Sequence, residues 1–399
     1  MAAAADRIAD YVVRTPAVRA PSLERSGANV WLKLETRQRT GSFKDRGAAN
    51  RLLQLSESER KSGVIAMSAG NHAQAVAYQG MRLGIPTTIV MPKPTPFTKV
   101  RRTEAFGAKV VLTGEGLAEA GEYATRAAAE RNLTLVPPYD DARIVAGQGT
   151  AGLEFVADVP DLDVLLVPVG GGGLIAGVAL AAKHVKPGIE IIGVQTEQYP
   201  SLQRVVKGLP PLHGAATIAE GIAVKSIGQI PLAIVRELVS DVILVADQAI
   251  EFAIHMLLED EKLLAEGAGA VGVAALLEHQ VRFRGRNVGI VMTGGNLDTG
   301  LLANVIMRVR LQEGRVVRMR VGISDRPGVL ADVARVIGEC GANILDVTHQ
   351  RMFGDVSSKN AELDITCETR SPADLDRIQA RLSEAGYSTS ILETTARGR

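Results

Sequence analysis

Short apolar runs alternate with longer amphipathic stretches from about Val64 to residue 312. Runs rich in valine, isoleucine and leucine recur at 64–69, 87–92 and 109–114, and the residues between them repeat apolar positions three and four apart. The short runs are typical of buried strands and the longer ones of amphipathic helices. Strands and helices that alternate in this way form parallel sheets covered by helices. The pattern therefore predicts an α/β unit of one or two lobes.

The pattern of apolar and amphipathic runs changes after residue 312. The remaining runs follow the order strand, helix, strand, strand, helix, strand, which is typical of a small ferredoxin-like domain. The strands are expected at 316–324, 344–352, 360–370 and 388–395, and the helices at 328–341 and 373–386. We therefore expect a large domain over 1–312, a linker at 313–316 and a separate domain over 317–399.

The composition favours a cytoplasmic protein that acts on small metabolites. Lys and Arg number 45 and Asp and Glu 44, which leaves a formal charge of +1 and gives no reason to expect nucleic acid. Asp6, Arg7 and Asp10 interrupt the apolar core that a signal peptide would need, and no apolar run is long enough to span a membrane. Cys340 and Cys367 lie outside any CxxC pattern, and we expect two ordinary buried thiols.

Three glycine-bearing turns each follow an apolar run. They are SAGNHAQ at 68–74, GGGGL at 170–174 and TGGN at 293–296. Parallel sheets present ligand sites at the carboxyl ends of their strands. We therefore expect the three turns to converge on one ligand.

The four glycines from Gly170 to Gly173 suit a phosphate group. They precede an apolar helix-like run, so backbone N–H groups and a helix N-terminus would both face an anion. A dinucleotide site is an open alternative, because the turn matches G-x-G-x-x-A and an acid follows the next strand. The residues of that alternative are Gly171, Gly173, Ala176 and Glu197. A mobile glycine hinge is the remaining interpretation.

Lys44 lies in the stretch TGSFKDRGA at 40–48, directly after Phe43. A lysine that forms an imine must be partly desolvated and held in place, and a preceding Gly-Ser-Phe turn suits this requirement. Taken alone, a lysine at the start of a helix is more often a solvated surface charge. The function of Lys44 therefore depends on partners elsewhere in the chain.

Together these motifs resemble the serine/threonine dehydratases, a family of fold-type II pyridoxal-phosphate enzymes, over about residues 8–310. The resemblance implies a two-lobed catalytic domain like the tryptophan synthase β subunit, with a smaller lobe at about 45–142. It implies pyridoxal 5'-phosphate (PLP) as cofactor and Lys44 as the Schiff-base lysine and catalytic base. It also places Phe43 against the cofactor ring and makes Gly170, Gly171, Gly172, Gly173 and Leu174 the phosphate cradle.

The resemblance also assigns the turns at 68–72 and 293–296. In the family the first turn holds the substrate carboxylate, and its residues here are Ser68, Ala69, Gly70, Asn71 and His72. Asn71 would in addition reach the phenolic oxygen of the cofactor. Thr293 would present a hydroxyl to the pyridine nitrogen, which weakens the electron sink and so favours elimination over racemisation.

The implied reaction is β-elimination of L-threonine to 2-oxobutanoate and ammonia, with some activity on L-serine, in a homodimer or homotetramer. A serine-preferring dehydratase or an amino-acid racemase of the same fold is the nearest alternative. Related racemases carry a second serine where this chain has Ala69, so racemisation should be minor. They also have carboxylates where this chain has Gln195, Tyr199 and Ser201, so we expect no metal site. Glu266 matches an acid near the ring, but a helix N-terminal acid is an equal alternative.

The C-terminal part resembles the ACT domain, an amino-acid-sensing module, over about residues 317–395. Its first turn is Asp325, Arg326, Pro327 and Gly328, and its second is Gly341, Ala342 and Asn343. In ACT domains a small amino acid binds between paired protomers, so Asp325 and Asn343 are the expected effector-binding residues. A branched-chain amino acid such as isoleucine or valine is the implied effector. A domain that serves only dimerisation, or a catalytically silent amino-acid sensor, is the alternative.

Overall fold

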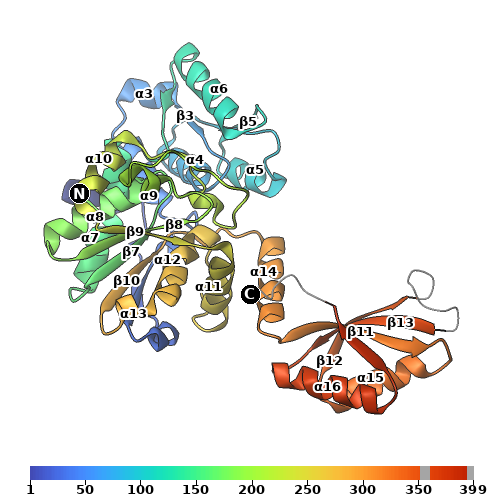
Figure 1. Ribbon diagram of the computed structural model, residues 1–399. Helices are drawn as coiled ribbons and strands as arrows, with labels where there is room; N and C mark the ends of the chain where they lie inside the picture. The colour runs from blue at the N-terminus through green and yellow to red at the C-terminus, as the bar shows by residue number, and fades with distance from the viewer. Residues whose placement is uncertain (351–359, 393–399) are drawn as a thin grey trace. The chain divides into compact units, whose positions relative to one another are not determined.

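The computed structural model describes residues 1–350 and 360–392, and it separates into two compact units, Met1–Leu297 and Asp298–Arg399 (Figure 1). Helix α14 (Thr299–Gln312) is grouped with the second unit. The predicted linker at 313–316 follows this helix and stays a prediction. Throughout the described ranges, every helix is too short or too polar to cross a membrane.

The first unit contains a six-stranded sheet with the order β1-β2-β10-β7-β8-β9. All neighbouring strands are parallel except β1 and β2. The strands are β1 (Ala17–Arg19), β2 (Asn29–Leu34), β7 (Val164–Pro168), β8 (Glu190–Thr196), β9 (Asp241–Val245) and β10 (Asn287–Met292). Strand β10 therefore lies between β2 and β7, although it is the last of these strands in the sequence.

A second, four-stranded parallel sheet has the order β5-β4-β3-β6. Its strands are β3 (Val64–Met67), β4 (Thr87–Met91), β5 (Lys109–Leu112) and β6 (Thr134–Leu135). The expected α/β fold with parallel-rich sheets is therefore confirmed. The predicted bounds of the smaller lobe, 45–142, stay a prediction.

Helices pack around both sheets, as the labels in Figure 1 show. The α-helices of the first unit are α1 (Ala2–Ile8), α2 (Lys44–Leu52), α3 (Glu57–Ser62), α4 (Asn71–Leu83), α5 (Phe97–Glu104), α6 (Leu117–Glu130), α7 (Ala142–Asp158), α8 (Gly173–Val185), α9 (Ser201–Val206), α10 (Gln229–Leu238), α11 (Asp247–Glu259), α12 (Gly267–Glu278) and α13 (Gln280–Phe283). Short 3-10 turns are η1 (Pro21–Ser26), η2 (Glu35–Arg37) and η3 (Glu220–Ile222). Because helices cover the sheets, strands such as β7 are buried along their whole length.

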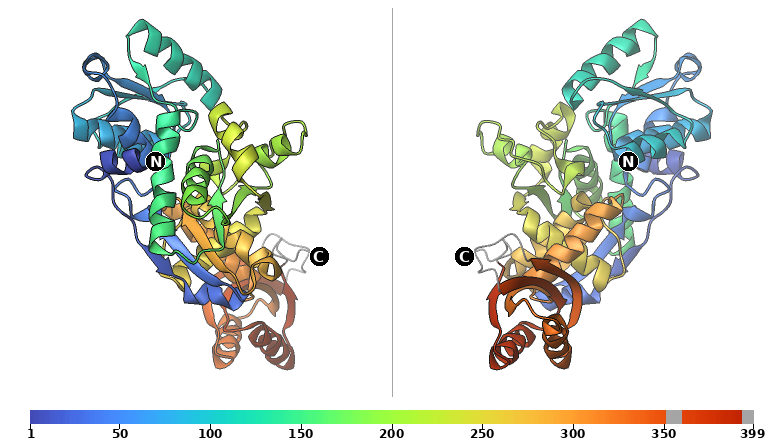
Figure 2. Two further views of the ribbon diagram at one scale, coloured as in Figure 1. Left: turned by 90° about the vertical axis from the view of Figure 1, so that its left-hand side faces the viewer. Right: turned by 90° about the vertical axis from the view of Figure 1, so that its right-hand side faces the viewer.

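The second unit has the ferredoxin-like order that the sequence predicts. After α14 come β11 (Val316–Ser324), α15 (Val329–Glu339), β12 (Asn343–Gln350), β13 (Asn360–Glu368), α16 (Pro372–Glu384) and β14 (Ser388–Ile391). The strands form an antiparallel sheet with the order β12-β13-β11-β14. Figure 2 shows α15 and α16 side by side on one face of this sheet.

The apolar core of the second unit lies between its sheet and its helices. In β11, Met319, Val321 and Ile323 are buried, whereas Arg318 and Arg320 lie on the other face. This alternation is what a strand with one covered face requires. Both cysteines are free and buried, as expected. The ends of the predicted strands at 344–352 and 388–395 lie outside the described residues.

Candidate active site

The turn that carries Lys44 is joined to the turn that follows strand β10. Ser42 pairs with Gly294 in an isolated antiparallel bridge, and the N–H of Phe43 donates to the carbonyl oxygen of Thr293 at 3.0 Å. Lys44 is then the first residue of α2. Two motifs that lie some 250 residues apart in sequence numbering are therefore fixed next to each other.

The amine of Lys44 is held in a partly buried place. Its Nζ donates to the carbonyl oxygen of Pro138 at 2.7 Å and lies 5.2 Å from the centre of the Phe43 ring. Burial lowers the pKa of Lys44 to about 8, and the negative charge of Glu266 opposes this shift. A larger fraction of Lys44 is therefore neutral near pH 7 than for a surface lysine, as an amine nucleophile requires.

The glycine loop joins β7 to α8. Gly172 has φ of +92° and is the N-cap of α8, so a residue with a side chain would be strained there. A Cβ added at Gly171 would lie 2.2 Å from the ring of Tyr139. No acceptor for the N–H groups of Gly171, Gly172 and Gly173 is found within the described parts of the chain, and these groups can therefore bind an anion.

Asn71 lies at the centre of a hydrogen-bond network that joins three turns. Its Nδ2 donates to Oε1 of Glu266 at 2.7 Å, and its Oδ1 accepts from Nδ2 of Asn296 at 2.8 Å. The same Nδ2 of Asn296 donates to the carbonyl oxygen of Thr40 at 2.7 Å. The network therefore fixes the orientation of the Asn71 amide next to the Lys44 turn.

Glu266 precedes α12 as its N-cap, but its side chain makes no capping hydrogen bond. The carboxyl group instead accepts the hydrogen bond from Asn71. Burial raises the pKa of Glu266 to about 7, against the hydrogen bond from Asn71, which lowers it. The side chain of Glu266 therefore belongs to the site network and does not cap its own helix.

The turn at 68–72 leads from β3 into the N-terminus of α4. Oγ of Ser68 accepts from the N–H of Gly70 at 3.1 Å, and a Cβ at Gly70 would meet nothing within 4 Å. Ala69 is partly exposed beside it. Nε2 of His72 lies 2.9 Å from the carbonyl oxygen of Val136, and burial lowers the pKa of His72 to about 3. His72 is therefore neutral, and its ring N–H is used within the protein.

The hydroxyl of Thr293 is buried and has no hydrogen-bond partner among residues 1–350 and 360–392. The same holds for Oγ of Ser42. A buried polar atom without a partner costs free energy, and a bound group would satisfy it. A ligand that carries a hydrogen-bonding ring atom and an anionic group would supply the partners that Thr293 and the glycine loop lack within the described residues.

Gln195, which stands where related racemases are expected to carry a carboxylate, is fully buried and uses both ends of its amide. Its Nε2 donates to the carbonyl oxygen of Val169 at 3.3 Å and to Oγ of Ser201 at 3.1 Å. Its Oε1 accepts from the N–H groups of Leu202 and Gln203 at 3.0 and 3.1 Å. Where the structure describes the chain, no three His, Cys, Asp or Glu side chains cluster as metal ligands would.

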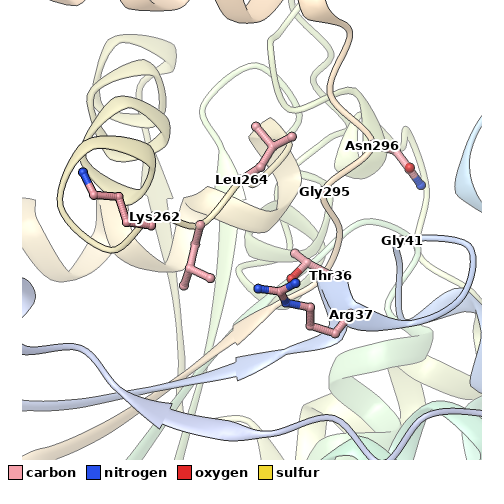
Figure 3. Close-up of a pocket in the computed structure, with 8 residues that line it drawn as sticks. Thr36, Arg37, Gly41, Lys262, Leu264, Gly295 and Asn296 are labelled. Carbon is pink, nitrogen blue, oxygen red and sulfur yellow. The ribbon is translucent and has the colours of Figure 1, made fainter.

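A cavity of about 270 Å³ includes Gly41, from the turn that precedes Lys44, in its lining (Figure 3). Thr36 and Arg37 come from η2, and Asn296 comes from the turn after β10. The complete lining is Thr36, Arg37, Gly41, Lys262, Leu263, Leu264, Gly295 and Asn296. Gly41 and Asn296 therefore form part of both this cavity and the surroundings of Lys44.

Sequence motifs identified most of these residues, but not Pro138, Tyr139 or Asn296 as contacts of the site. Pro138 contributes a backbone carbonyl, which every residue has, so its type gives no signal. Asn296 was within the TGGN motif, and its position directly after two glycines is the signal that could have identified it. Tyr139 packs on the glycines and is found only through the fold.

The expected effector residues lie in the second unit. Asp325 is in the turn between β11 and α15, and Asn343 is the first residue of β12; both are exposed. Gly328, with φ of +90°, is the N-cap of α15, as the sequence predicts for a glycine that opens a helix.

Models of known protein families match segments in both units of the chain. A family model described as pyridoxal-phosphate dependent enzyme matches residues 8–294, and an ACT domain model matches residues 311–386. An L-threonine ammonia-lyase of Thermotoga maritima is 42% identical over 371 residues, which cover 92% of each chain.

Two solved structures are also similar to the chain. Threonine deaminase isoform 2 of Solanum lycopersicum has a TM-score of 0.73 and 36% identity, over 76% of this chain and 85% of its own. Maize serine racemase has a TM-score of 0.73 and 35% identity, over 78% of this chain and 97% of its own.

Proposed function

Because the chain belongs to the family of pyridoxal-phosphate-dependent enzymes, we propose that it deaminates L-threonine to 2-oxobutanoate and ammonia. The observation that carries this proposal is the Lys44 amine, which lies in a partly buried place near Thr293 and the glycine loop. PLP is the cofactor, so the dinucleotide alternative for the glycine loop is wrong. The name of the Thermotoga relative supports threonine as the substrate.

The residues that would hold PLP follow from the free groups of the site. The N–H groups of Gly171 to Gly173 would bind its phosphate, and the unpartnered hydroxyl of Thr293 would face its ring nitrogen. When bound, PLP supplies an electron sink that acidifies the Cα–H of an attached amino acid. Asn71, oriented by Glu266 and Asn296, would bind the phenolic oxygen.

Groups of the protein itself would carry out substrate binding and proton transfer. The N-terminus of α4, which begins with Asn71, has N–H groups without intrahelical acceptors and would bind the substrate carboxylate. Lys44, whose pKa burial lowers to about 8, would take the Cα proton as general base. Ala69 contributes no acid or base beside that carboxylate site. A second proton donor for racemisation is therefore lacking at this position.

Racemisation is the competing reaction, because the maize serine racemase has a similar fold. Ala69 is the observation against it. Incubation with L-threonine and L-serine, followed by assay of 2-oxo acid and by chiral analysis of the remaining amino acid, separates the two. We expect 2-oxobutanoate and no accumulation of the D-enantiomer. D-amino acid as the main product would contradict the proposal.

Replacement of the lysine tests the assignment directly. Lys44→Ala should abolish the absorbance of lysine-bound cofactor and lower turnover by at least about 10³-fold, since nucleophile and base are lost together. Lys61→Ala, which removes an exposed lysine of α3, should leave both unchanged. Retention of cofactor absorbance and turnover in Lys44→Ala would exclude this role for Lys44, whereas absence of 2-oxo acid from the unmodified protein would favour the silent amino-acid sensor.

Regulation by the second unit completes the proposal. The ACT domain match and the exposed Asp325 and Asn343 support binding of an amino-acid effector, and a branched-chain amino acid suits an enzyme that consumes threonine. We further propose that the enzyme is a cytoplasmic homodimer or homotetramer. Size-exclusion chromatography with light scattering, with and without isoleucine or valine, measures the oligomeric state.

A further inference from the structure

We propose that Gln195 is a positioning residue that fixes the start of the glycine loop and thereby sets its affinity for the cofactor phosphate. The inference goes beyond the proposed function. It rests on PLP as the cofactor and on no particular substrate.

Val169 is the residue directly before the four glycines. Its N–H and its carbonyl oxygen are both hydrogen-bonded to residues of β8. Its N–H donates to the carbonyl oxygen of Val194 at 2.8 Å, and its carbonyl oxygen accepts from Nε2 of Gln195 at 3.3 Å. The first bond continues the pairing of β7 with β8, but the second requires an amide side chain. Gln195 therefore extends the support of the sheet by one peptide group, up to the point where the loop begins.

The other end of the Gln195 amide anchors this support. Its Oε1 accepts from the N–H groups of Leu202 and Gln203, which are early residues of α9 and have no intrahelical acceptors. Nε2 also donates to Oγ of Ser201. All the polar capacity of a fully buried side chain is thus used, and its orientation is fixed.

The N–H groups of Gly171, Gly172 and Gly173 make no hydrogen bond within the described chain, and we propose that they bind the ligand. The loop therefore depends on other contacts for its support. The carbonyl oxygen of Gly171 accepts from the N–H of Gly228 at 3.1 Å, and Tyr139 packs on Gly171 and Gly173. These contacts hold the middle of the loop, whereas Gln195 holds Val169, the residue directly before it. Loss of the Gln195 bond should let Val169 and Gly170 move, so that the N–H groups no longer converge on one anion.

The test compares the affinity of the full-length apoenzyme for PLP and for pyridoxal, which lacks the phosphate. Gln195→Ala should raise the Kd for PLP by about tenfold or more and change the Kd for pyridoxal by less than about twofold, as expected for loss of an anion site that depends on this hydrogen bond. Gln195→Met, which keeps most of the side-chain volume, should give the same result if Gln195→Ala folds poorly. Fluorescence titration measures both constants, and circular dichroism checks the fold.

Gln203→Ala is the matched control. Gln203 lies on α9, the helix whose first N–H groups donate to the Gln195 side chain, and its own Nε2 donates to the carbonyl oxygen of Val242 at 3.1 Å, which is remote in sequence from the glycine loop. Its replacement should leave the ratio of the two Kd values unchanged within about twofold. An equal loss of affinity for PLP and pyridoxal in the Gln195 variants, or the same change of ratio in Gln203→Ala, would overturn the inference.

The experiment distinguishes a failure of this inference from a failure of the proposed function. If the unmodified protein did not bind PLP, the cofactor assignment itself would be wrong. If it bound PLP and both Gln195 variants kept its ratio of Kd values, only the role of Gln195 would be refuted.

Discussion

Glu266 carries a carboxyl group that the folded protein keeps protonated up to unusually high pH. Burial raises its pKa from 4.5 to about 7. Between these values the unfolded chain releases a proton that the folded apoprotein retains, so the stability contributed by this group falls as the pH rises. Glu266→Gln removes the titration. We expect the variant to gain about 1–3 kcal/mol in unfolding free energy, relative to the unmodified protein, between pH 5 and pH 8.

Urea unfolding of the two apoproteins at both pH values measures this difference. Glu57→Gln is a suitable control, because the Glu57 side chain is 83% exposed and pairs only with the exposed Lys61 among its described neighbours. Its difference from the unmodified protein should be the same at both pH values. A Glu266→Gln variant whose relative stability did not change with pH would show that the carboxyl group is ionised throughout.

Gly171 is a second residue whose type the structure requires. An added Cβ would lie 2.2 Å from the Tyr139 ring, so Gly171→Ala should displace the tyrosine and destabilise the protein by about 1–3 kcal/mol. PLP affinity should fall as well, because Tyr139 packs on the proposed phosphate cradle. Gly188→Ala is the control, since a Cβ there meets nothing within 4 Å. Thermal unfolding measures both variants, and Gly171→Ala with Tyr139→Ala should recover part of the loss.

At the scale of elements, Arg46 joins α2 to α7 and to the 3-10 turn after β2. Its guanidinium donates to both carboxylate oxygens of Glu35 at 2.8 Å and to both of Glu154 at 2.7 Å, and its side chain is fully buried. Glu35 is equally buried, and the positive charge of Arg46 helps to lower its pKa against the effect of burial. The ion pair therefore fixes the helix whose first residue is Lys44.

Removal of this arginine should leave the buried carboxylate of Glu35 without its ion pair, whereas Glu154 keeps its pair with Lys33 at 2.8 Å. We expect Arg46→Ala to cost about 3–5 kcal/mol of unfolding free energy. Lys61→Ala, which breaks the exposed pair with Glu57, should cost less than about 0.5 kcal/mol. Chemical denaturation gives both values. A loss below about 1 kcal/mol in Arg46→Ala would mean that α2 is held mainly by apolar packing.

Local patterns predicted the elements and the motifs at their ends, because periodicity and glycine turns act over a few residues. They could not predict the partners of Arg46, since Glu154 is 108 residues away. The same limit applies to the Pro138 carbonyl that holds Lys44 and to the Asn296 amide that orients Asn71. Such contacts depend on the path of the whole chain. The glycine loop, by contrast, was predicted as an anion site from its local sequence, and its free N–H groups agree with that.

At the scale of the whole molecule, the sequence pattern did not predict the order of the strands in the sheets of the first unit. The alternation of strands and helices indicated parallel sheets, and that is confirmed. The pattern gave no reason why β10 should lie between β2 and β7. Pairing between distant strands depends on the packing of every intervening element rather than on any local signal. In the second unit the strand order followed from a small domain type with few alternatives.

Regulation belongs to the same scale, because the proposed effector residues and Lys44 lie in different units. Isoleucine or valine should change the rate of the unmodified enzyme, and Asp325→Ala or Asn343→Ala should raise the effector concentration for half-maximal response by about tenfold. Rates without effector should stay within about twofold, as should the response of Glu384→Ala, an exposed site on α16. Steady-state assays across effector concentrations measure this. If no effector changed the rate, the ACT unit would have a structural role only.

The pairing of β2 with β10 has a consequence for synthesis of the protein on the ribosome. Residues 29–34 emerge early, but their partner strand, 287–292, is made last in the first unit. Lys44 is therefore synthesised long before Thr293. The smaller sheet, whose strands span 64–135, can form much earlier. With the proposed role of Thr293, cofactor capture waits until almost three quarters of the chain has left the exit tunnel, and ribosome-bound fragments that end before residue 287 should not retain PLP.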